Sequence, residues 1–220
     1  SEFMPRLFAE NGRLLDSQGR ITLDTPEALR ALENYRETYS YSDRTIYDFW
    51  KNALEGFADG TAAMTVVFIN YASHILNSQM SRIAGKLGFA PVPGGKPLLG
   101  GGVIGIAQSC TCPAAACKFL EWLYADLVAP VFTMLGGLSP CRSAYSNRDI
   151  SEQYPWLSTA RKSFPTAQRR SNSTYYQNFS ELQLETILAA HVQQAVLGVC
   201  SPEEALKQAQ EDCNRYFQPW

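Results

Sequence analysis

The spacing of apolar residues predicts helices along most of the chain. Thr25 and Ser201 precede prolines that suit a first helical position, and Asp43 can cap the helix that follows it. Pro130 is expected to kink its helix, and Pro155 to break the helical stretch around it. Apolar residues at intervals of three to four predict helices over residues 25–39, 42–60, 73–83, 112–125, 126–137, 147–164, 180–198 and 201–217.

Other stretches have the composition of buried β-strands. Residues 62–72, 87–93 and 102–108 are rich in apolar and β-branched residues, which suits strands buried on both faces. A polar turn at residues 16–19 leads into a further short strand. Strands alternating with helices, followed by helices alone, indicate an α/β fold with a helix-rich C-terminal third.

The composition fits a folded domain without affinity for polyanions. The chain has 220 residues, 45% hydrophobic and 18% charged, enough for one large domain or two small ones. A formal net charge of −2, without blocks of like charge, argues against binding nucleic acid or anionic membranes. The apolar runs are too short or too interrupted to span a bilayer. Because the chain opens on Ser1-Glu2-Phe3 and shows no signal peptide, we expect it to be excised from a longer protein.

Residues 100–105 match the pattern G-x-G-x-x-G, which also occurs in dinucleotide-binding turns. That turn requires a strand directly before it and a helix beginning within it, so that the helix N-terminus binds the pyrophosphate. Here a proline-glycine loop precedes the match and a strand-like stretch follows it. The context argues against a dinucleotide site.

No metal or cofactor is predicted. The chain lacks a C-x-x-C pair and has only His74 and His191 as imidazole ligands. The thiols are interpreted as small packing residues in a reducing compartment, with a disulfide framework as the lesser alternative. The six cysteines are Cys110, Cys112, Cys117, Cys141, Cys200 and Cys213.

Catalysis is not required by any motif. The sequence contains no G-x-S-x-G, H-E-x-x-H or Walker pattern. His191 lies within an amphipathic helix and is interpreted as structural, and His74 as a polar surface residue. The chain is therefore expected not to be an enzyme, with a cysteine-dependent enzyme as a weaker alternative.

The aromatic residues divide into a core set and a loop set. Rings at helical spacing are assigned to the core: Trp50, Phe57, Phe119, Trp122 and Phe217. Rings at strand ends or in loops are Phe3, Phe68, Tyr71, Tyr175, Tyr176 and Phe179. Beside Asn70 and Asn178, the second set suits a cleft that stacks on the C–H face of a sugar and bonds its hydroxyls, although ordinary loop packing explains any one ring equally well.

Six motifs in this order resemble the extracellular solute-binding proteins of ABC importers, in the carbohydrate-type family that includes maltose-binding protein. They span most of the chain: "ALEGFADGTAAMTVVFINYA", "GKLGFAPVPGGK", "GGGVIGIAQS", "AAACKFLEWLYA", "LGGLSPCRSAY" and "SPEEALKQAQEDCNRYF".

The resemblance implies a type II periplasmic-binding-protein-like fold, in which two α/β lobes with mixed sheets flanked by helices close around a ligand. This chain would lack most of the N-terminal lobe. Residues 1–97 and 143–220 would form the C-terminal lobe, and residues 98–142 would cross back to complete the other lobe. Apolar residues of the helices at 113–136 would then lack their partner, so we expect self-association, domain swapping or disorder near them.

The resemblance also implies a set of ligand contacts. The family often has a sugar-stacking tryptophan just after the strand that here includes residues 63–68, where this chain has Asn70 and Tyr71 instead. Glycines at the interlobe crossing let backbone approach a ligand closely. Arg142 fits a polar cleft position, with a structural ion pair as the alternative. The implied contacts are Glu2, Phe3, Asn70, Tyr71, Gly100, Gly101, Gly102, Arg142 and Tyr176.

The implied function is non-catalytic binding of a small polar solute, a sugar or oligosaccharide, for delivery to the membrane subunits of an ABC importer. The parent protein would be an extracellular or periplasmic lipoprotein. The alternative is a ligand-sensing domain of the same fold, fused to a DNA-binding transcription regulator in the cytoplasm, which six cysteines would suit. In neither case would this segment contact nucleic acid directly.

Overall fold

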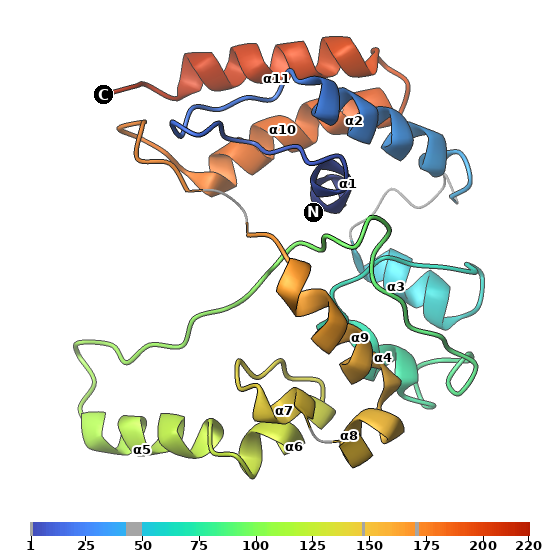
Figure 1. Ribbon diagram of the computed structural model, residues 1–220, viewed down its shortest axis with the longest axis vertical. Helices are drawn as coiled ribbons and strands as arrows, with labels where there is room; N and C mark the ends of the chain where they lie inside the picture. Colours follow the sequence, from blue (N-terminus) through green and yellow to red (C-terminus); the bar gives the residue numbers. More distant parts are fainter. Residues whose placement is uncertain (1, 43–49, 147, 170–171) are drawn as a thin grey trace. The chain divides into compact units, whose positions relative to one another are not determined.

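The computed structural model describes residues 2–42, 50–146, 148–169 and 172–220. Their contacts divide the chain into two compact units. Unit 1 comprises residues 1–45, 92–99 and 166–220, and unit 2 comprises residues 46–91 and 100–165. Figure 1 labels the helices of both units.

Unit 1 is a helical assembly around a single hydrophobic core. Helix α10 (Glu181–Val196) packs on α11 (Pro202–Tyr216), and α2 (Pro26–Tyr39) contacts both of them as well as α1 (Phe3–Ala9) (Figure 1). The apolar faces of these helices supply most of the core. Burial of these faces stabilises the helices more than the intrinsic helix propensity of their residues does. The largest fully buried side chains of this core include Leu7, Leu23, Leu32, Leu184, Leu206 and Phe217.

The helix boundaries of unit 1 follow the capping residues. The hydroxyl of Thr25 accepts a hydrogen bond from the amide of Ala28 at 3.2 Å, and that of Ser201 accepts one from Glu204 at 3.1 Å. Gly198, with φ of +77°, follows the end of α10. The predictions for α2, α10 and α11 are confirmed, whereas α1 was not predicted.

Unit 2 contains shorter helices around a smaller core. Its helices are α3 (Trp50–Ala58), η1 (Ile69–Tyr71), α4 (Ala72–Leu76), α5 (Pro113–Leu123), α6 (Val128–Met134), α7 (Ser143–Ser146), α8 (Arg148–Gln153) and α9 (Pro155–Ser163), and the turn η2 (Phe164–Thr166) follows. Trp156 and Leu157 of α9 are fully buried against Ala129 of α6 and Ala144 of α7. The predicted break at Pro155 is confirmed, because α8 ends just before it.

The predicted kink at Pro130 is wrong, because α6 begins at Val128 and Pro130 therefore lies in its first turn. Amide groups there have no carbonyl partner within the helix, so proline removes no hydrogen bond. The predicted cap Asp43 lies outside the described residues.

The predicted strands do not pair within the described part of the chain. Its only β-pairings are isolated bridges, Leu15 with Ile21, Leu98 with Gln168 and Tyr176 with Pro219. Residues 62–68, 87–93 and 102–108 form no helix and no ladder, and residues 69–72 are helical. A strand exists only where a neighbour accepts its backbone hydrogen bonds, and none of the described segments lies beside these stretches in that way. The prediction of a mixed sheet is therefore not confirmed.

Candidate functional site

Three of the predicted ligand contacts lie in unit 1. Phe3 and Tyr176 are buried in its core, and Glu2 is exposed at the start of α1. Burial raises the pKa of the Tyr35 hydroxyl, and the neighbouring Glu2 carboxylate raises it further. The guanidinium of Arg6 lies 4.7 Å from the centre of the Tyr35 ring. Of the three predicted contacts in unit 1, only Glu2 is accessible, and it lies beside the protonated hydroxyl of Tyr35.

The other six predicted contacts lie in unit 2. Asn70 and Tyr71 form the short helix η1, and the carbonyl of Asn70 accepts a hydrogen bond from the Ser73 hydroxyl at 3.3 Å. Gly100 lies against Phe68, since a Cβ on this glycine would be 3.2 Å from the phenyl ring. The stretch through Gly101 and Gly102 is exposed. Phe68, which directly precedes η1, and Gly100 are therefore neighbours.

Arg142 is exposed in the turn before α7. Its carbonyl accepts hydrogen bonds from the Tyr145 amide at 3.0 Å and the Ser146 hydroxyl at 2.9 Å. These bonds hold the backbone at Arg142. Its role as a ligand contact stays a prediction, as do those of the eight other residues.

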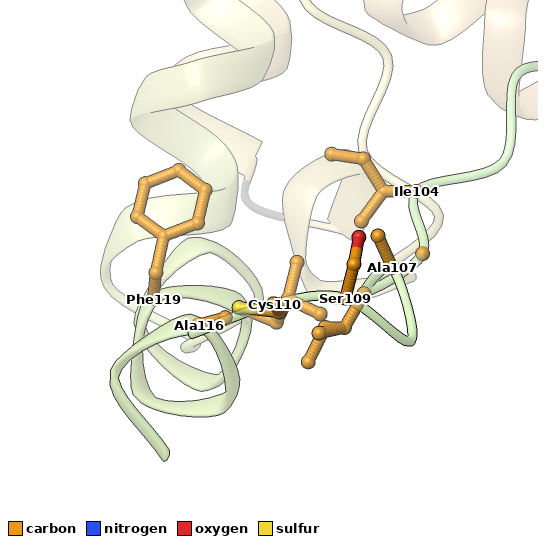
Figure 2. Close-up of a pocket in the computed structure, with 9 residues that line it drawn as sticks. Ile104, Ala107, Ser109, Cys110, Ala116 and Phe119 are labelled. Carbon is orange, nitrogen blue, oxygen red and sulfur yellow. The ribbon is translucent and has the colours of Figure 1, made fainter. Parts of the chain in front are cut away.

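A shallow apolar hollow of about 400 Å³ lies in unit 2, between the loop before α5 and the first turns of that helix (Figure 2). Among its lining side chains, only Ser109 and Cys110 carry polar atoms. A sugar requires several convergent hydrogen-bonding groups, so this hollow alone does not provide a sugar site. Its lining residues are Ile104, Gly105, Ile106, Ala107, Ser109, Cys110, Ala116, Phe119 and Leu120.

The rings beside this hollow correct one prediction. Their spacing predicts that Phe119 and Trp122 lie in the core, but they are 53% and 56% exposed, with ring centroids 5.8 Å apart. Helical spacing identifies an apolar face, but it does not show whether another element covers that face. Val103 belongs to a stretch with the composition of a buried strand, and it is likewise almost fully exposed, in the loop before α5.

The cysteines are all free thiols. Cys213 is buried, whereas Cys112 and Cys117 are exposed, so the interpretation of the thiols as packing residues is wrong for those two. The thiol of Cys141 lies 3.6 Å from the carbonyl of Tyr124. No cluster of three or more potential metal ligands occurs among the described residues.

His191 links two helices. Its Nε2 lies 2.8 Å from a carboxylate oxygen of Asp212 in α11, and the other oxygen of Asp212 accepts a hydrogen bond from Arg215 at 2.7 Å. The imidazole is largely buried between α10 and α11. This arrangement confirms the structural interpretation of His191.

A family model described as bacterial extracellular solute-binding protein matches residues 3–159. This match covers most of the chain. The chain belongs to this family of bacterial solute-binding proteins. The resemblance stated from the sequence motifs is thereby confirmed.

Solved structures give the fold of this chain. Maltose-bound MalE3 of T. maritima superposes with a TM-score of 0.80 at 23% identity, covering 96% of this chain and 55% of that one. A solute-binding protein of Agrobacterium radiobacter K84 in complex with ribitol gives 0.74 at 23% identity, covering 98% and 56%. A Thermotoga lettingae TMO protein bound with α-D-tagatose gives 0.73 at 26% identity, covering 97% and 55%. The fold is that of type II periplasmic-binding proteins.

The chain spans about half the length of these solved relatives, 55–56%. Among the described residues, no helix combines the length and the apolar composition needed to cross a bilayer.

Proposed function

We propose that this chain is part of a protein that binds a sugar or polyol without chemical change and delivers it to an ABC importer. The family match over residues 3–159 carries this proposal. The ligands named for three solved relatives, maltose, ribitol and α-D-tagatose, support the ligand class. The membrane subunits of the importer are the proposed partner. The family of extracellular proteins favours this function over a cytoplasmic sensor domain, and we propose a lipid-anchored parent outside the cytoplasm.

The proposed solute contacts in unit 2 are Asn70 and Tyr71 together with the backbone of Gly100, Gly101 and Gly102. An asparagine amide both donates and accepts hydrogen bonds, and tyrosine offers a ring face and a hydroxyl, which together suit a polyhydroxylated ligand. Without side chains, the glycines let a ligand approach peptide groups directly. Arg142 and the exposed Glu2 of unit 1 are further proposed contacts, whereas the rings of Phe3 and Tyr176 are buried in the core of unit 1.

The proposed lobe assignment keeps residues 1–97 and 143–220 in one lobe, with a helical C-terminal third, and gives residues 98–142 to the other. This division differs from the two compact units of the structure, in which residues 46–91 and 143–165 belong with residues 100–142. Residues 62–68 and 102–108 are apolar and unpaired in the described chain. Solved relatives are nearly twice as long. We propose that a further stretch of chain of the kind they contain pairs with these segments and completes a mixed sheet.

Thermal unfolding with a ligand panel tests the proposed function. We expect one of maltose, ribitol, D-mannitol or D-tagatose to raise the midpoint temperature, because a ligand at a hundred times its Kd stabilises by about 2.7 kcal/mol. Asn70→Ala with Tyr71→Ala should abolish the shift, whereas Tyr41→Ala, at an exposed tyrosine of unit 1, should preserve it. Absence of saturable binding of any sugar or polyol, in this chain and in a full-length protein containing it, would overturn the proposal.

A further inference from the structure

Helices α1 and α2 of unit 1 pack on each other, and four polar side chains gather where they meet (Figure 1). We call Glu2, Arg6, Asn34 and Tyr35 the polar cluster of unit 1. The Nη1 of Arg6 donates to the side-chain oxygen of Asn34 at 2.7 Å, and its guanidinium carbon lies 4.7 Å from the centre of the Tyr35 ring. The carboxylate of Glu2 neighbours the Tyr35 hydroxyl. The cluster therefore links the start of α1 to the second half of α2.

Glu2 directly precedes α1 and already has helical dihedral angles, with φ of −69° and ψ of −28°. Glu2 and Arg6 are therefore one turn apart on the same face of the helix. The side chain of Glu2 makes no capping hydrogen bond to the described amides of α1. Its two oxygens, which offer about four lone-pair sites, are thus not used by the helix.

Tyr35 gives this carboxylate a fixed support. The ring is partly buried and packs against the hydrophobic core of unit 1. Burial raises the pKa of the Tyr35 hydroxyl, and the Glu2 carboxylate raises it further, so the hydroxyl stays protonated well above neutral pH. A protonated hydroxyl can donate to a carboxylate and fix its orientation. Since Glu2 itself is exposed, the cluster presents an accessible carboxylate on a rigid base.

Arg6 completes the support and balances the charge. Its guanidinium is held by the Asn34 bond and by the face of the Tyr35 ring, and its Nε is buried without a hydrogen-bond partner in the described part of the chain. An arginine side chain keeps its proton at every physiological pH. The cluster contains one carboxylate and one guanidinium, so it has no net charge and favours a neutral ligand.

We propose that the Glu2 carboxylate binds two adjacent hydroxyl groups of the solute, and that Tyr35 and Arg6 are the positioning residues that hold it. This inference rests on the proposed function, in which Glu2 is a solute contact. Each carboxylate oxygen accepts a charge-assisted hydrogen bond from one hydroxyl. A sugar or polyol offers such a pair of hydroxyls, whereas a solute without adjacent hydroxyls does not.

Isothermal titration with maltose, ribitol, D-mannitol and D-tagatose tests the contact. For whichever of the four binds, Glu2→Ala should weaken binding on the order of tenfold, equivalent to about 1.4 kcal/mol. Tyr35→Phe keeps the ring but removes the hydroxyl, and Arg6→Lys keeps the charge but removes the planar fork, so each should weaken binding about threefold. The controls are Glu33→Gln and Tyr39→Phe, at other residues of α2, which should bind as the unmodified chain does.

Monodeoxy analogues of the solute that binds test the hydroxyl pair. Two analogues that lack adjacent hydroxyls should bind the unmodified chain more weakly than the parent solute, and the Glu2→Ala variant should no longer distinguish them from the parent. Equal losses for these analogues in both proteins would show that Glu2 does not contact those hydroxyls.

The positioning role has a readout that needs no solute. In a chain labelled with ¹³C at tyrosine Cζ, Tyr35 should ionise at a lower pH in Glu2→Gln than in the unmodified chain, because the neighbouring negative charge is removed. The Tyr35→Phe variant assigns the signal, and circular dichroism checks that each variant is folded.

An unchanged Tyr35 titration in Glu2→Gln would overturn the inference whatever the solute panel shows. A solute that binds with equal affinity to the unmodified chain and to Glu2→Ala would overturn it while leaving the proposed function intact. If no sugar or polyol binds to this chain or to a full-length protein containing it, the proposed function fails and this inference fails with it.

Discussion

The hydroxyl of Tyr176 accepts a hydrogen bond from the backbone amide of Ile21 at 2.8 Å, across 155 residues of sequence. The tyrosine is buried, and so is Ile21. This bond therefore satisfies a backbone donor that water does not reach, and it fixes the segment before α10 to the turn that precedes α2.

The first prediction concerns this bond. Tyr176→Phe keeps the ring in the core but leaves the Ile21 amide without an acceptor, which should lower the free energy of unfolding by about 1–3 kcal/mol. Urea denaturation measures the loss. Tyr175→Phe is the matched control and should change the free energy of unfolding by about 0.5 kcal/mol or less, as surface substitutions do. Equal stabilities of the two variants would contradict the assigned role of the hydroxyl.

The second prediction concerns the buried thiol of Cys213. Burial raises the pKa of this thiol to about 12, and the nearby Asp212 carboxylate adds to the effect. At pH 8 we expect iodoacetamide to modify the exposed Cys112 and Cys117, whereas Cys213 should react only as the protein unfolds, because the thiolate is the nucleophile. Mass spectrometry of digested samples locates the labels.

The raised pKa of Cys213 also predicts a dependence of stability on pH. An unfolded thiol has a pKa of about 8.5, so the folded state binds the proton more tightly. Its contribution to stability is complete below about pH 8.5 and declines as the pH rises toward about 12. Cys213→Ala should remove this part of the decline in stability at alkaline pH and leave the part that comes from ionisation of the tyrosines. An identical alkaline profile in the variant would refute the linkage.

The third prediction concerns Gly136, which follows α6 with φ of +98°. A Cβ at this position would overlap the hydroxyl of Ser73 and lie 2.8 Å from the Ser73 Cβ. Gly136→Ala should therefore destabilise the chain through both the left-handed backbone and the overlap, costing about 2–5 kcal/mol. Gly85→Ala, at φ of +80° with open space around the added methyl group, should cost only the backbone term of about 1–2 kcal/mol. Thermal unfolding compares the two, and equal losses would contradict the packing argument.

The helices could be predicted from the sequence because their signals are local. Thr25 and Ser201 make their capping bonds with residues three positions away, and Gly198 ends α10 through its own backbone conformation. Such features need no knowledge of the rest of the fold. Helix α1 lacks a side-chain cap, which explains why it escaped prediction.

Pairing and burial could not be predicted in the same way. Residues 62–68 have the composition of a strand, but a strand depends on a neighbour that can lie anywhere in the sequence. Tyr176 and Phe119 show the same limit for the candidate site. The sequence predicts a loop position for Tyr176, which is buried, and a core position for Phe119, which is half exposed. Which surface covers a ring is a property of the whole fold, so residue type and spacing do not determine it.

The fourth prediction is that the chain self-associates through unit 2. Val103 is 98% exposed, and Phe119, Trp122 and Leu127 present further large apolar side chains in the segment from the loop to α6. So many large exposed apolar side chains in one segment are unusual on a monomer, and a second copy of the chain can cover them. Sedimentation velocity over a range of concentrations should show association. Val103→Glu with Trp122→Glu should weaken it at least tenfold, because burying each such side chain contributes about 1.5–3 kcal/mol.

Leu182→Glu, at an exposed leucine of α10 in unit 1, is the control and should associate normally. A chain that stays monomeric at every concentration, or a double variant that associates as strongly as the unmodified chain, would show that this surface is not the contact.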